Sequence, residues 1–239
     1  MAAHPTAPDF GPGPDAGSVP GPDSGRGSAP GPALSLTERR KAATQQEIAL
    51  TAARLFAERG AEGTTAEDIA RTAGVSLRTF YRYFRTKEDA VAPLLAEGSR
   101  QWIALLAAAG PGSAPLPALV AAARAALDPA PGTPAESLAW TRGLLRAMPA
   151  DPALRDVWHR IHHEAEAALR PVLARLGGLD PEGLDARLLA ATANTAMRVA
   201  VETWAAGEAP PASAAELAAT ALHRLAAPLP SLTASTAGS

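Results

Sequence analysis

The residues with the clearest potential for chemistry are four basic side chains set close together. Arg78, Arg82, Arg85 and Lys87 occur within residues 76–87, a segment that contains no acidic residue. The whole chain has a net charge of −2, and a local basic patch in a mildly acidic protein indicates a site for an anionic partner. Solvated surface charge is the alternative, and the charge pattern alone does not decide between them.

A second cluster contains the histidines His159, His162 and His163. His159 and His163 are four positions apart, so on a helix they share one face, at a spacing that can hold a metal ion. A metal site needs a third and a fourth ligand, and apart from the lone His223 no other histidine-rich segment offers them. We therefore expect polar residues of a surface or a pocket, with no metal and no cofactor.

Catalytic signatures are missing from the chain. There is no Gly-x-Ser-x-Gly motif, no glycine-rich phosphate loop, no zinc-protease motif and no cysteine nucleophile. The acidic residues are scattered singly along segments that look like exposed helix faces. The sequence predicts a protein that is not an enzyme, because an enzyme would need an unrecognised site in the helical part of the chain.

The elements that must position these residues are helices. The chain has 239 residues, 47% of them hydrophobic, many of these alanine, and alternating Val, Ile and Thr are missing. These features predict an all-α fold. After the segment with the basic residues we expect helices over 87–109 with a kink at Pro93, and over 116–127, 135–147, 152–175, 183–207 and 213–226.

The chain divides into four parts by composition. Residues 1–34 form a Pro/Gly-rich tail that we expect to be disordered. A small folded domain is expected over 35–86, a helical body over 87–227 and a second disordered tail over 228–239. The first helix begins after Ser35 or after Thr44, since both residues start a capping-box pattern.

Two short helices joined at a glycine follow that first helix. Thr65 is placed to cap one helix, Gly74 ends it, and Ser76 is placed to cap the next. The second helix carries arginines on one side and Phe80 and Phe84 on the other. This is the pattern of a helix-turn-helix, whose second helix enters the major groove of DNA. Residues 35–86 are therefore expected to form a DNA-binding domain, and the tail, which has few basic residues, is expected to add little DNA affinity.

The segments Ala53–Gly60, Thr64–Ala70, Ala73–Ser76 and Thr79–Phe84, together with Lys87-Glu88, resemble the N-terminal domain of the tetracycline-repressor-like (TetR) family. The match covers about 45 residues almost without a gap. The resemblance implies a three-helix DNA-binding domain followed by a helical domain that binds an effector and dimerises. It implies a homodimeric transcriptional regulator that recognises a palindromic double-stranded DNA operator.

The resemblance also suggests which residues touch DNA. Leu77 and Arg78 would point into the major groove, where arginine can pair with guanine. Tyr81 and Tyr83 would bond phosphates, although the family more often has histidine at the second position. The expected contacts are Thr65, Ser76, Leu77, Arg78, Thr79, Tyr81, Arg82, Tyr83 and Lys87.

The body offers fewer signals. Large aromatic and methionine side chains often line apolar pockets, and more often they are plain core. The candidates for an effector pocket are Trp102, Trp140, Met148, Trp158, His159, His162, Met197 and Trp204. We expect a repressor released from its operator by a small apolar effector; a body that binds a protein partner, or no ligand, is the alternative.

Dimerisation is expected through the last two helices. The first of them has an apolar surface formed by Leu184, Leu188, Ala191, Thr195 and Val199, and the second carries Leu217, Leu222 and Leu225. Two such helices from each subunit would make a four-helix bundle. A hairpin packed against its own domain is the other possibility.

The chain lacks cysteine, a secretory signal pattern and any apolar run long enough to span a membrane. We therefore expect a cytoplasmic protein with no membrane partner.

Overall fold

The computed structural model describes residues 35–110, 112–128 and 135–225. Regular structure in these ranges is entirely helical and includes no strand, which confirms the predicted fold class. The elements are α1 (Leu36–Arg59), α2 (Ala66–Thr72), α3 (Leu77–Tyr83), the 3₁₀ turn η1 (Asp89–Val91), α4 (Ala92–Ala107), α5 (Pro115–Leu127), α6 (Ala135–Ala147), α7 (Pro152–Gly177), α8 (Leu184–Ala206) and α9 (Ala212–Leu225). The predicted tails, 1–34 and 228–239, lie outside the described residues.

Helix α1 is longer than a start at Thr44 would give. It begins at Leu36, directly after Ser35, and the Thr44 hydroxyl donates to the Arg40 carbonyl inside the helix, at 3.0 Å. Its first three turns are largely exposed, and burial begins at Ile48. The basic residues 39–41 therefore lie on a helix.

The helix expected over 87–109 has a different beginning. The Thr86 hydroxyl accepts from the Asp89 backbone N–H at 3.1 Å, η1 follows, and α4 starts only at Ala92. Pro93 therefore lies in the first turn of α4, where no backbone donor is needed, and the prediction of a kink there was wrong. The five later helices begin and end within two residues of their predicted bounds.

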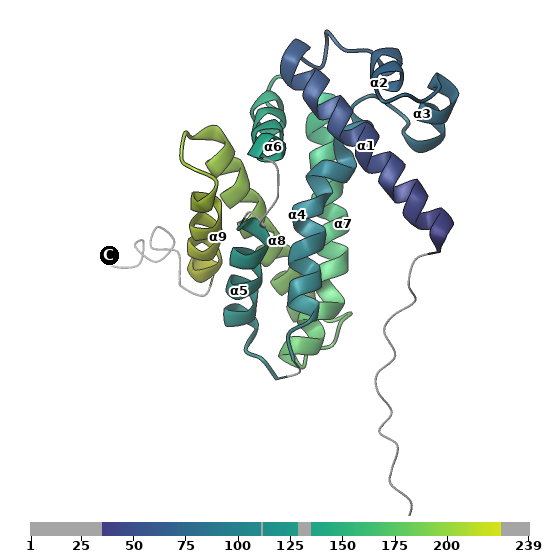
Figure 1. The fold of residues 1–239 in the computed structure, drawn as a ribbon. Helices are drawn as coiled ribbons and strands as arrows, with labels where there is room; N and C mark the ends of the chain where they lie inside the picture. The colour runs from purple at the N-terminus through teal and green to yellow at the C-terminus, as the bar shows by residue number, and fades with distance from the viewer. Residues whose placement is uncertain (1–34, 111, 129–134, 226–239) are drawn as a thin grey trace, which may run out of the picture. The chain divides into compact units, whose positions relative to one another are not determined.

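Figure 1 shows α1 crossing one end of the long helices α4 and α7, with α2 and α3 beside it. In the body, α8 packs against α7 and α9, and α5 packs against α4 and α9. A buried core fills this part of the body; its large members are Trp102, Leu106, Leu119, Leu169, Leu173, Met197 and Leu222.

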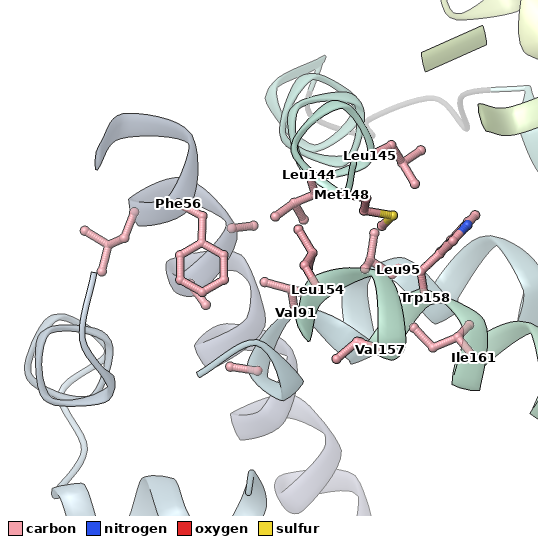
Figure 2. Close-up of a cluster of buried hydrophobic side chains, with 14 of the residues drawn as sticks. Phe56, Val91, Leu95, Leu144, Leu145, Met148, Leu154, Val157, Trp158 and Ile161 are labelled. Atoms are coloured by element: carbon pink, nitrogen blue, oxygen red, sulfur yellow. The ribbon is translucent and has the colours of Figure 1, made fainter. Parts of the chain in front are cut away.

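A second core joins the first three helices to the body, and we call it the shared core. Its large members are Ile48, Leu55, Phe56, Ile69, Phe80, Phe84, Val91, Leu95, Leu144, Leu145, Met148, Leu154, Val157, Trp158, Ile161 and Trp204. In Figure 2, Leu144 of α6 and Met148, which directly follows α6, face Leu154 of α7 and Leu95 of α4, and Phe56 of α1 lies beside them. Because α1 packs in this core, a movement of α4, α6 or α7 would also displace α1 and the DNA-binding helices beside it. The domain boundary at residue 86 remains a prediction.

Candidate DNA interface and effector cavity

The helix-turn-helix is built by local capping. The Thr65 hydroxyl accepts from the Asp68 backbone N–H at 3.1 Å, and the Asp68 carboxylate accepts from the Thr65 backbone N–H at 3.2 Å. Gly74 has φ +68°, a left-handed conformation that glycine adopts readily. The Ser76 hydroxyl then caps α3 by accepting from the Thr79 backbone N–H at 3.1 Å. Both predicted caps are confirmed, and together they orient α3 relative to α2.

Helix α3 has one buried face and one exposed face. Phe80 is completely buried and Phe84 nearly so, as predicted for the two core aromatics. Leu77 and Tyr81 are 40% and 55% exposed, although both are large hydrophobic residues. Arg78 is also exposed, and among the described residues it has no hydrogen-bond or ion-pair partner. This exposed face offers apolar contact and a free guanidinium, the groups that read thymine methyls and guanine edges.

Tyr83 and Arg82 form a pair at the end of α3. The Arg82 guanidinium lies 5.0 Å from the centre of the Tyr83 ring and donates to its hydroxyl at 3.3 Å. Tyr83 is half-buried against the shared core, so its ring is fixed while its hydroxyl stays at the surface. Both groups can donate to a phosphate oxygen.

The smaller hydroxyls are already engaged within the protein. The Thr65 hydroxyl donates to the Asp68 carboxylate at 2.6 Å, and this hydrogen bond, with the one from the Thr65 backbone, lowers the pKa of Asp68. The Ser76 and Thr79 hydroxyls lie 2.9 Å apart and bond each other. These residues set the geometry of the helix starts. The single hydrogen of the Thr65 hydroxyl is used on Asp68, and only one hydroxyl of the Ser76–Thr79 pair keeps a hydrogen to donate to a phosphate.

Lys87 lies where two loops meet. Its amine donates to the Ala61 carbonyl in the loop after α1, at 2.5 Å, and lies 3.7 Å from the Glu88 carboxylate. The side chain is half-buried. The sequence predicts a DNA contact for Lys87 and gives no sign of this hydrogen bond, because its two residues are 26 positions apart and no local pattern links them.

A cavity of about 450 Å³ lies between α1, α4, α7, α8 and the start of α9. Its buried wall is formed by Leu95, Trp158, His162, Met197, Trp204 and Ala214, and its half-buried apolar residues include Leu50 and Leu94. The polar residues Gln46, Glu97, Ser99, Gln101, Asp128 and Thr141 complete the lining. A cavity of this size is within the range that small-molecule sites occupy in proteins.

The structure brings together half of the predicted pocket residues. Trp158, His162, Met197 and Trp204 line the cavity. Trp102 and Met148 are instead fully packed in the two cores, Trp140 packs half-buried against the shared core, and His159 is exposed. Periodicity identifies the inner face of a helix but cannot tell which inner side chains border an empty space. The α1 residues Gln46 and Leu50 were missed for that reason.

The three histidines do not act together. His159 and His163 are exposed, whereas His162 is buried. No group of three or more metal-ligating side chains occurs among the described residues. The burial of His162 lowers its pKa, which the positive charge of Arg198 reinforces, while a hydrogen bond to Asn194 and the charge of Glu202 oppose it.

The predicted apolar face of α8 lies at the surface. Leu184 and Leu188 are 71% and 53% exposed, and Val199 is also exposed. On α9 the outcome is mixed, because Leu222 is completely buried within its own subunit and only Leu225 is exposed. Along the described ranges, no helix is long and apolar enough to span a membrane.

Comparison with known proteins supports the assignment of the first three helices. Residues 48–92 match the family model described as bacterial regulatory proteins of the tetR family. The chain is 28% identical over 172 residues to the HTH-type transcriptional regulator TcmR of Streptomyces glaucescens, and the match covers 71% of this chain and 76% of TcmR. Both matches include the segment with the exposed face of α3.

Solved structures agree in fold. A TetR-family transcriptional regulator from Syntrophomonas wolfei is 17% identical with a TM-score of 0.55, over 79% of this chain and 97% of that one. A second, from Rhodococcus sp., is 19% identical with a TM-score of 0.51, over 76% and 98%. The family match, the curated relative and the shared fold lead to one conclusion: residues 48–92 resemble the DNA-binding domain of tetR-family regulators, and they lie in an all-helical fold shared with transcriptional regulators of that family.

Proposed function

We propose that the protein is a homodimeric repressor that leaves a palindromic operator when a small, mostly apolar molecule occupies the cavity. The observation that carries this proposal is the composition of the cavity wall. It includes Gln46 and Leu50 of α1, the helix whose next turns hold the core of the DNA-binding helices. A ligand in the cavity therefore touches an element that positions α3.

The residues proposed to touch DNA divide into two groups. Arg78 and Leu77 have exposed side chains at the start of α3 and would read base edges. Tyr81, Arg82 and Tyr83 would hold phosphates and set affinity more than sequence. Thr65, Ser76, Thr79 and Lys87 would support these contacts, since their side chains already fix the helix starts and the loop.

The proposed dimer uses the exposed apolar face of α8. An apolar stripe that includes Leu184, Leu188 and Val199 is unusual on an isolated monomer and is typical of an interface. A single seven-residue recognition helix reads too few bases for useful specificity, so two copies are expected on DNA.

Binding of the purified protein to DNA upstream of its own gene tests the proposal. We expect one preferred site with two half-sites one helical turn, or a multiple of it, apart. An effector should weaken binding by about 5- to 150-fold, the usual range of coupling between two sites. A protein that shows no sequence preference would contradict the proposal. If the protein binds its operator but does not respond to any small molecule, the helical body would instead bind a protein partner or serve dimerisation only.

A further inference from the structure

Within the cavity wall, one buried polar atom has no partner. His162 is 95% buried, and its Nε2 is closed to water with no hydrogen bond to any described residue. Its other ring nitrogen, Nδ1, lies 3.2 Å from the Asn194 side-chain oxygen. A buried polar atom without a partner is uncommon and costly, and in a cavity wall it indicates a missing hydrogen-bond partner.

The bonds of Asn194 determine the form of the His162 ring. The Asn194 amide nitrogen donates to the His162 backbone carbonyl at 2.9 Å, so the amide oxygen is the atom that faces Nδ1. That oxygen can only accept, and therefore Nδ1 carries the hydrogen. Burial lowers the pKa of His162, which keeps the ring neutral at pH 7. Nε2 is then an acceptor with a free lone pair.

The other buried polar groups of the wall are already satisfied. The Trp158 indole N–H donates to the Glu202 carboxylate at 2.7 Å, and the Trp204 indole N–H donates to the Pro210 carbonyl at 3.1 Å. Both indoles therefore offer only apolar surface to a ligand. The ionisable lining residues other than His162 are Glu97 and Asp128, both acidic, and no lysine or arginine lines the cavity. This charge balance disfavours an anion.

We propose that the cavity selects a neutral, mostly apolar molecule whose hydroxyl or N–H group donates a hydrogen bond to Nε2 of His162. The inference rests on the proposed effector role of the cavity and adds the chemical class of the effector. Because Nε2 is closed to water, the ligand reaches it through a small shift of the cavity wall. The Trp158 ring, whose centre lies 4.1 Å from that of His162 at an interplanar angle of 80°, holds the imidazole in place.

A matched series of probes tests the proposal by calorimetric titration of the full chain at pH 7.5. The probes are 4-phenylphenol, which has a donor, 4-methoxybiphenyl, which has a similar shape without one, and biphenyl-4-carboxylate, which is an anion. We expect the phenol to bind about tenfold more tightly than the ether, as one additional buried hydrogen bond allows. The carboxylate should bind most weakly.

Two variants separate the hydrogen bond from the shape of the cavity. His162→Phe keeps a ring against Trp158 and should bind the phenol and the ether equally, whereas His163→Phe, at the exposed neighbouring position, should keep the tenfold preference. Asn194→Asp places a carboxylate against Nδ1 and favours the protonated ring, so Nε2 becomes a donor. In that variant the affinity for biphenyl-4-carboxylate should rise about tenfold, which a merely structural role of Asn194 would not produce.

The outcomes distinguish this inference from the proposed function. Equal binding of the phenol and the ether by the wild-type protein would overturn the hydrogen bond to Nε2 and leave the effector cavity standing. No binding of any probe would count against the effector cavity itself, and with it the inference. The wild-type series and Asn194→Asp decide the question if His162→Phe fails to fold.

Discussion

Replacement of Arg78 by alanine tests the DNA-binding face most directly. The side chain is exposed at the second position of α3 and bonds to no described residue, so its removal should change the free energy of unfolding by only about 0.5 kcal/mol or less. The loss of DNA affinity then reports the DNA contact itself.

The expected loss follows from the number of contacts. A bidentate arginine–guanine pair contributes about 1–3 kcal/mol of discrimination, and a dimer on a palindrome has two of them. Arg78→Ala should therefore weaken operator binding by about 2–6 kcal/mol, which is roughly 30-fold to 10⁴-fold. Binding to random DNA should be much less affected, because only phosphate contacts contribute there.

Fluorescence anisotropy over a salt series measures both quantities. Arg82→Ala should weaken all sequences and reduce the slope of log affinity against log salt by about 0.9 per subunit. Tyr83→Phe should weaken all sequences alike by about 0.5–1.5 kcal/mol without changing that slope. Arg224→Ala, at an exposed position near the end of α9, is the control. If Arg78→Ala weakens binding to operator and to random DNA equally, Arg78 does not read bases. The division of the interface into base-reading and phosphate-binding residues would then be wrong.

Three further predictions concern stability and assembly. Thr64→Val should lower the free energy of unfolding by about 1–3 kcal/mol in urea titrations, because the completely buried hydroxyl donates to the Gly60 and Leu55 carbonyls, at 2.9 and 3.3 Å; Thr64→Ser, which keeps the hydroxyl, should lose less. If the proposed dimer through α8 forms, Leu188→Asp should shift the protein from dimer to monomer in sedimentation experiments, since the new charge would be buried in that interface; a dimer that persists in the variant would place the interface elsewhere. His162 is held neutral in the fold, with its pKa below the ordinary value of 6.5, so the unfolded chain binds a proton first and stability should fall as the pH drops below about 6.5. In His162→Phe that part of the pH dependence should disappear, and an equally steep decline would assign it to other groups.

The sequence alone determined the helix-turn-helix. Capping residues act on the backbone within three positions, a glycine fixes a left-handed turn, and the spacing of Phe80 and Phe84 selects the buried face of α3. These are local effects, so Thr65, Gly74 and Ser76 could be assigned their roles before the fold was known. The exposed leucines of α8 were predictable for a similar reason, because one helix face is set by its periodicity.

Only the tertiary structure decided what surrounds the cavity. Trp102 and Trp204 are equally plausible pocket residues in the sequence, and both are buried in a core, yet only Trp204 also borders the cavity. The difference depends on the positions at which α4, α7 and α8 cross one another, and a local sequence pattern does not determine how distant helices cross. The same holds for the Lys87 bond to Ala61 and for the pairing of His162 with Asn194, which joins residues 32 positions apart. Helix faces are local properties of a chain, whereas cavities and buried polar pairs arise only when distant helices meet.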